Sequence, residues 1–174
     1  MSERTLEQLM ADRYSCRSYA ERKLENDKLI QVLEAGRLAP TAKNNQPQKI
    51  YVLESEEALA KINALCKSIR GAQTVLMVAV DSGNLFNNPF QPGVNSGDQD
   101  AAIVATHMML EAEKLGLGTC WVNMFSPEET AKAFGLPENE KVVLLMPIGY
   151  KGSEAAPSPR HSERKDLAET TVRL

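Results

Sequence analysis

The 174-residue sequence has few of the residues that build metal, disulfide or aromatic-rich sites. It contains two histidines, and its three cysteines form no CxxC pair, so neither a zinc pattern nor a disulfide framework can be drawn. We therefore expect no metal site and a cytoplasmic protein with reduced thiols. Aromatic residues make up only 5%, a low supply for a self-contained core, and we expect a second copy of the chain to complete that core.

Long apolar runs and an excess of basic charge are also missing. No stretch approaches the roughly 20 apolar residues that a membrane span needs, and the first residues lack the basic and apolar regions of a signal peptide. The net charge of −3 provides no broad basic surface. We therefore expect neither a membrane nor a nucleic acid as a partner.

The common catalytic motifs are absent as well. There is no GxSxG nucleophile elbow and no Walker A loop. The GxG sequence Gly116-Leu117-Gly118 follows a predicted helix and precedes a predicted strand, whereas a Rossmann phosphate loop needs the opposite order. We interpret Gly116 instead as the residue that ends the helix.

Apolar segments and helix start signals together predict one domain, residues 1–174, with a sheet covered by helices. The predicted strands are 50–53, 74–80, 119–125 and 142–149. The predicted helix starts are the capping box Thr5-x-x-Gln8 and the N-caps Asn26, Ser55, Asp98 and Ser126.

The longest predicted helix runs from about Asp98 to Leu115. Apolar residues cover most of its circumference, which predicts burial on all sides, in part against a second subunit. His107 is accordingly interpreted as a core histidine. Two other segments stand out: 81–97, rich in Asn, Gly and Pro, is expected to be a lid loop, and 151–174 an extended C-terminal arm.

Polar residues gather in four places that a simple scaffold would leave apolar. These are Arg13 to Arg17, the amide-rich loop 39–47, Asn123, and the tail cluster Arg160, Arg164 and Lys165. Guanidinium, hydroxyl and amide groups beside apolar strands suit a phosphorylated planar cofactor better than a metal or a covalent nucleophile. Each also has a plainer interpretation: solvated helix-end arginines, ordinary turn residues and, for Cys16, a small core thiol.

Four segments resemble, in order and spacing, elements of the FMN-dependent nitroreductase family. They are RYSCR, APTAKNNQPQKIYVL, the helix 98–115 followed by GLGTCWVNMF, and PIGY followed by HSERKDL. The resemblance implies a three-layer α-β-α fold of the α+β class, with the C-terminal arm exchanged in a homodimer that binds two FMN molecules. The chain departs from the family pattern at Gln48, where the family commonly has Trp.

The resemblance also implies roles for individual residues. Those that would hold the FMN phosphate and ribityl chain are Arg13, Tyr14, Ser15, Arg17, Arg164 and Lys165. Those that would lie along the flavin ring are Pro40, Thr41 and Ala42, joined by Asn44 from the other subunit. Those that would reach the pyrimidine or the N5 edge are Lys67 or Arg70, and Val122, Asn123 and Met124.

The implied activity is that of an FMN-dependent NAD(P)H oxidoreductase. NADPH or NADH would pass a hydride to the flavin and leave, and a nitroaromatic, quinone or related small oxidant would then take the electrons in a ping-pong cycle. Two alternatives stay open: a specialised enzyme of the same fold, for reductive dehalogenation or flavin breakdown, and a non-catalytic FMN-binding protein.

Overall fold

The computed structural model describes residues 4–174, which form a four-stranded antiparallel sheet between two layers of helices. The strand order is β1-β2-β4-β3. The strands are β1 (Gln48–Leu53), β2 (Thr74–Asp81), β3 (Leu117–Thr119) and β4 (Glu140–Tyr150). The two long central strands, β2 and β4, are the apolar runs predicted to be buried on both faces, and Met77 of β2 pairs with Leu145 of β4.

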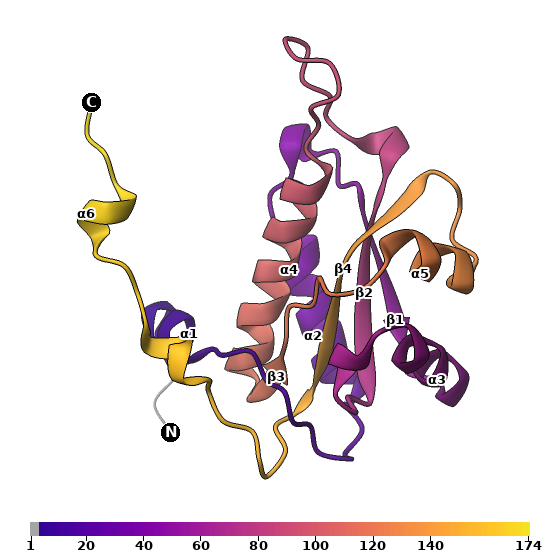
Figure 1. Ribbon diagram of the computed structural model, residues 1–174, viewed down its shortest axis with the longest axis vertical. Coiled ribbons are helices and arrows are strands. Elements are labelled where there is room, and N and C mark those ends of the chain that lie inside the picture. The colour runs from indigo at the N-terminus through magenta and orange to yellow at the C-terminus, as the bar shows by residue number, and fades with distance from the viewer. Residues whose placement is uncertain (1–3) are drawn as a thin grey trace.

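Helices cover both faces of this sheet (Figure 1). On one face lie α2 (Asn26–Arg37) and α4 (Gly97–Lys114), and on the other α3 (Glu56–Leu65) and α5 (Pro127–Phe134). Successive strand residues point to opposite faces, so Leu76 and Val78 join the α2/α4 core while Val75 and Met77 join the α3/α5 core. The predicted three-layer α-β-α fold is confirmed.

Both cores are built without aromatic residues at their centres. The largest fully buried side chains of the described residues are all Ile, Leu, Met or Val. Unbranched Met side chains adapt to irregular gaps, so aliphatic residues with Met can fill a small core. The shortage of aromatics therefore does not by itself require a second copy of the chain.

Most helix starts lie where the capping residues predict them. Thr5 forms its capping box with Gln8 before α1 (Leu6–Asp12), and Ser55 and Ser126 cap α3 and α5 with their hydroxyls. Two predicted caps are wrong. Asn26 is the first residue of α2, after Glu25, and α4 begins at Gly97, after Ser96. Asp98 therefore lies inside the first turn of α4, where its carboxylate pairs with Lys141 at 2.9 Å.

The predicted strand 119–125 is also wrong, because the sheet ladder breaks there. β3 pairs with β4 only from Leu117 to Thr119, and pairing resumes as a single bridge between Val122 and Leu145. The break faces Pro147, which accepts the Cys120 N–H but has no N–H to donate in return. The chain leaves the sheet as a loop only after Val122.

The helix α4 is buried on one side only. Val104 and Met108 are buried in the α2/α4 core and pack against Gly36 of α2, whereas His107 is exposed together with Ile103, one turn earlier on the same face. The expectation of a core histidine is therefore wrong within one chain, because His107 lies on the face turned away from the sheet. Gly116 follows the helix with a φ of +77°, which agrees with its predicted role at the helix end.

Two segments leave the body of the molecule (Figure 1). The segment between β2 and α4 projects as a narrow loop, closed by a bridge between Asn87 and Asn95, with Phe90 exposed near its tip. The C-terminal tail passes α1 through a short 3-10 helix (Pro159–Ser162) and continues outward through α6 (Leu167–Thr170). Its apolar residues Leu167, Val172 and Leu174 are exposed. Among residues 4–174, no helix has the length and apolarity to cross a bilayer.

Candidate functional site

The segment Arg13 to Arg17 lies beside β3 and pairs with it through a single bridge. Ser15 forms a parallel bridge with Thr119, and the Cys16 N–H donates to the Thr119 carbonyl at 2.8 Å. Cys16 is fully buried. Because side chains alternate along an extended chain, its neighbours Ser15 and Arg17 point away from the core.

Gly118 of β3 makes room for this segment. A Cβ at Gly118 would lie 2.6 Å from Cys16 Sγ and 2.8 Å from Cys16 Cβ, both closer than van der Waals contact allows. Gly149, the cross-strand partner of Gly118, has no such neighbour, since its nearest contact would be Tyr19 Cδ1 at 3.5 Å. The absence of a side chain at Gly118 thus sets the position of Ser15 and Arg17.

We expect Gly118→Ala to lower the free energy of unfolding by about 1–3 kcal/mol, as overpacking in a core does. Gly149→Ala, in the same strand pair, should change it by much less. Urea unfolding of both variants measures the difference. Equal stability of the two variants would contradict the close packing of Cys16 against Gly118.

The thiols near this segment are structural. Burial raises the pKa of the Cys16 thiol, which donates to the Ser18 carbonyl at 3.1 Å, and burial also raises the pKa of Cys120. Thiolate chemistry needs a lowered pKa. The interpretation of Cys16 as a core thiol is confirmed, and all three cysteines are free and buried.

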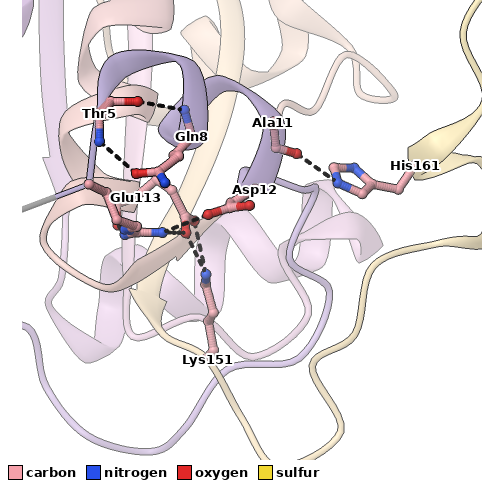
Figure 2. Close-up of polar contacts among 8 residues, drawn as sticks. Thr5, Gln8, Ala11, Asp12, Glu113, Lys151 and His161 are labelled. Carbon is pink, nitrogen blue, oxygen red and sulfur yellow. Dashed lines mark hydrogen bonds and ion pairs between the residues drawn. The ribbon is translucent and has the colours of Figure 1, made fainter. Parts of the chain in front are cut away.

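The tail brings further basic groups to the same place. His161 Nε2 lies 3.0 Å from the Ala11 carbonyl at the end of α1 (Figure 2), and its ring meets the Tyr14 ring edge-on at 6.3 Å between centroids. Arg164 donates through one terminal nitrogen to the His161 carbonyl at 2.6 Å and the Glu163 carbonyl at 2.7 Å. The His161 contacts hold the turn 158–164 against α1 and Tyr14, while the Arg164 bonds close the turn on itself.

The two segments enclose a depression of about 270 Å³, called here the arginine depression. Its lining residues are Arg13, Tyr14, Ser15, Arg17, Ser158, Arg160, His161 and Arg164. None of these carries a carboxylate. Four guanidiniums and two serine hydroxyls facing one small space form a donor set for a phosphate-sized anion.

A second depression of about 250 Å³ borders the first and shares Arg17 with it; we call it the loop depression. Its other lining residues are Ser68, Arg70, Cys120, Trp121, Val122, Asn123 and Met124. Arg70 has a left-handed backbone, with a φ of +57°, of the kind that functional sites often hold. Trp121 Nε1 donates to Asn123 Oδ1 at 3.1 Å, which fixes the Asn123 amide at the surface.

The structure thus brings together many, but not all, of the predicted site residues. Lys67 and Lys165 are exposed and line neither depression. Ser68, Ser158 and His161, by contrast, were not predicted. The pair Ser158-Pro159 is a helix start signal that marks a turn, but only the path of the tail shows which residues that turn meets.

The loop with Pro40, Thr41, Ala42 and Asn44 lies elsewhere. The Ala42 N–H donates to Asp100 in the first turn of α4. The arginine depression lies near the last turn of that helix, because Lys151 contacts both Glu113 of this turn and the ring of Tyr14. A helix of 18 residues is about 27 Å long. Within one chain this loop therefore does not reach the arginine depression.

A buried carboxylate, Glu113, lies in the last turn of α4 and connects this turn to two distant parts of the chain (Figure 2). It pairs with Arg4 at 2.9 Å and with Lys151 at 2.9 Å, so it joins the start of the described chain, the helix and the start of the tail. Lys151 Nζ also lies 4.9 Å from the centroid of the Tyr14 ring. Sequence reasoning missed this cluster, because nothing local distinguishes Glu113 from a surface glutamate.

A larger hollow of about 540 Å³ lies between α5 and β4 and shares no lining residue with either depression. Its lining mixes acids with lysines, among them Glu128, Lys132 and Glu138, and includes no predicted site residue. No cationic cluster forms there, so size alone does not mark the site. Residues 4–174 hold no group of three or more His, Cys, Asp or Glu side chains placed to bind a metal.

Comparison with known proteins identifies the family to which this chain is similar. The model of the Nitroreductase family matches residues 10–69 and 64–150. A nitroreductase family protein from Clostridium difficile 630, known from its crystal structure, is 35% identical, with 97% of each chain covered and a TM-score of 0.89.

Two other similar proteins carry more specific descriptions. A Bacillus subtilis protein named FMN reductase (NAD(P)H) is 26% identical over 87% of this chain and 68% of its own. A protein from Desulfovibrio desulfuricans, solved in complex with FMN, has the same fold: its TM-score is 0.83, its identity 23%, and 99% of this chain and 98% of its own are covered. The chain described here belongs to the nitroreductase family.

Proposed function

We propose that this protein is an FMN-dependent NAD(P)H oxidoreductase that reduces small oxidants such as nitroaromatics and quinones. The observation that carries the proposal is the arginine depression, which is free of carboxylates and continues through Arg17 into the loop depression. The names of the relatives support it, because one is an FMN reductase and another was solved with FMN.

The residues of the arginine depression fit the phosphate of FMN. An arginine presents five N–H donors in a planar fork that matches phosphate oxygens. Arg17 and Arg164 each use only one terminal nitrogen on backbone carbonyls, at 3.2 Å to Ser15 and at 2.6 and 2.7 Å to His161 and Glu163. Their remaining donors and the Ser15 hydroxyl would hold the phosphate.

The residues of the loop depression fit a flat, polar ring system. Val122 contributes an apolar wall, and Arg70 and Asn123 contribute donors at its rim. When bound, FMN would supply the exchange of two electrons between a nicotinamide and an oxidant. A guanidinium such as Arg70 stabilises negative charge that develops beside it, while the exposed Met124 side chain limits which molecules enter. Solvent can supply the protons, so no side-chain acid is needed.

The working unit of this proposal is a homodimer in the cytoplasm. Pro40, Thr41, Ala42 and Asn44 lie about one α4 length from the arginine depression, so they would complete the site of a second copy. The exposed apolar residues of the arm would be covered by the partner. The three free, buried cysteines agree with a reducing compartment. The loop 81–97 is proposed as a lid over the shared site.

Steady-state turnover with NADH and NADPH against a panel of nitroaromatics and quinones tests the activity. We expect parallel lines in double-reciprocal plots, because both substrates use one site in turn. Turnover with only halogenated aromatics or flavins would favour a specialised enzyme, and no turnover by FMN-loaded protein would favour a binding protein. Sedimentation at micromolar concentration should give the dimer mass, and a monomer would contradict the shared site.

A further inference from the structure

The loop that begins at Thr41 holds an unusual backbone conformation. Lys43, Asn44 and Gln46 have φ angles of +53°, +55° and +50°. These lie in the left-handed region, which residues other than Gly rarely adopt. Asn tolerates this region, but Lys and Gln do so at a cost. A loop with three such residues in four positions persists only when surrounding contacts hold it.

Bonds within the loop account for part of this restraint. The Asn44 N–H donates to the Thr41 carbonyl at 2.9 Å, and the Gln46 N–H donates to the Thr41 hydroxyl at 3.0 Å. These bonds close the turn but do not fix it to the rest of the molecule. At the start of the loop, the fixed point is the Ala42 N–H, which donates to Asp100 Oδ1 at 2.9 Å.

Asp100 is a buried carboxylate, with only 2% of the residue exposed. Its second oxygen, Oδ2, accepts the Ser96 hydroxyl at 2.6 Å, so both oxygens have a donor. Both partners are donors, so this one carboxylate joins the loop to the residue that precedes α4.

Ser96 connects the same carboxylate to the projecting segment between β2 and α4. Its hydroxyl accepts the Phe86 N–H at 3.2 Å, and its own N–H donates to the Phe86 carbonyl at 3.0 Å. Lys43 connects the loop to this segment directly, because its Nζ lies 5.0 Å from the centroid of the Phe86 ring. The loop 41–46, the segment 85–96 and helix α4 therefore meet at one buried side chain.

We infer that Asp100 is a positioning residue, which holds the strained loop 41–46 in the form that contacts FMN bound to the other subunit. This inference rests on the proposed function for the identity of that ligand. Through Ser96, Asp100 also ties the loop to the segment 85–96. A displacement of that segment would therefore also move the loop residues that face the flavin.

The test compares Asp100→Ala with Asp98→Ala. Asp98 lies in the same turn of α4 but is exposed and bonds only to Lys141, so it controls for the loss of an acid at the helix start. In protein without FMN, we expect amide exchange of the peptide 41–47 to speed up at least tenfold in Asp100→Ala and to stay unchanged in Asp98→Ala. In the presence of FMN, we expect the Kd to rise about tenfold in Asp100→Ala, because a loop that has lost its acceptor at Ala42 must be ordered when FMN binds.

Asp100→Asn and Ser96→Ala complete the series. The side-chain carbonyl introduced by Asp100→Asn can still accept from the Ala42 N–H while the new amide group faces the Ser96 oxygen. This variant should therefore restore most of the slow exchange and of the FMN affinity. Ser96→Ala should give an intermediate result. If Asp100→Ala fails to fold, these two variants still decide the question through the order of their exchange rates.

The outcomes separate the two proposals. Unchanged exchange of residues 41–47 in Asp100→Ala would overturn the positioning role, whether or not FMN binds. Faster exchange with unaltered FMN affinity would show that Asp100 holds a loop that does not contact the flavin, which also overturns it. A wild-type protein that takes up no FMN would instead refute the proposed function, while the exchange experiment would still report on the contact between Asp100 and the loop.

Discussion

Arg17→Ala is expected to weaken FMN binding roughly 10- to 100-fold, the range that loss of charge-assisted hydrogen bonds predicts. Arg17 borders both depressions, so its guanidinium lies between the places assigned to the phosphate and to the ring. Arg164→Ala should have a similar effect, since Arg164 lines the arginine depression from the tail. Equilibrium titration of FMN-free protein, followed by flavin fluorescence, measures both.

Arg37→Ala is the control for a lost positive charge. Arg37 is an exposed residue of α2 that pairs with Glu34, and it lies in neither depression. Its removal should leave the FMN Kd within about twofold, as expected for a screened surface charge. If Arg17→Ala and Arg164→Ala both bind FMN like the wild type, the assignment of the phosphate to the arginine depression is refuted.

Glu113→Gln is expected to cost the largest amount of folding stability, about 2–4 kcal/mol. Removing one partner of a buried ion pair costs about 3–5 kcal/mol when the remaining charge stays buried. The side chains of Arg4 and Lys151 are 35% and 27% exposed, so water offsets part of this cost. The loss should appear as a lower urea midpoint of the FMN-free protein.

The neighbouring acid Glu111 supplies the control. It pairs with Lys114 on the surface of the same helix, and Glu111→Gln should cost less than about 1 kcal/mol. Because Lys151 also contacts the Tyr14 ring, Glu113→Gln should weaken FMN binding, whereas Glu111→Gln should not. Equal stability losses in the two variants would show that the buried cluster does not hold the tail against α4.

Local patterns in the sequence were sufficient to predict a sheet covered by helices, while the three-layer arrangement was implied by the family resemblance. The apolar runs of β2 and β4 and the hydroxyl caps Ser55 and Ser126 depend on residues that are close in the chain. The predicted strand 119–125 is wrong for the opposite reason. Its regular pairing is interrupted opposite Pro147, a residue of another strand, and no pattern within 119–125 shows that.

In the site, too, residues close in the chain could be predicted and residues brought together from distant segments could not. Arg13, Ser15 and Arg17 could be singled out because they lie within five residues. His161 and Ser158 could not, since their role depends on the tail turning back against α1. The buried carboxylates Glu113 and Asp100 are likewise visible only once contacts across 38 and 58 residues are known. Long-range contacts, which no local spacing encodes, determine which polar residues support the site.

The proposed function requires that this chain binds FMN and that a nicotinamide reduces the bound flavin. The most direct measurement is the visible absorbance of protein loaded with FMN and desalted, followed anaerobically during addition of NADPH or NADH. We expect a yellow protein that bleaches with at least one nicotinamide and regains its colour when a nitroaromatic or quinone is added. A colourless protein, or a yellow one that neither nicotinamide bleaches, would contradict it.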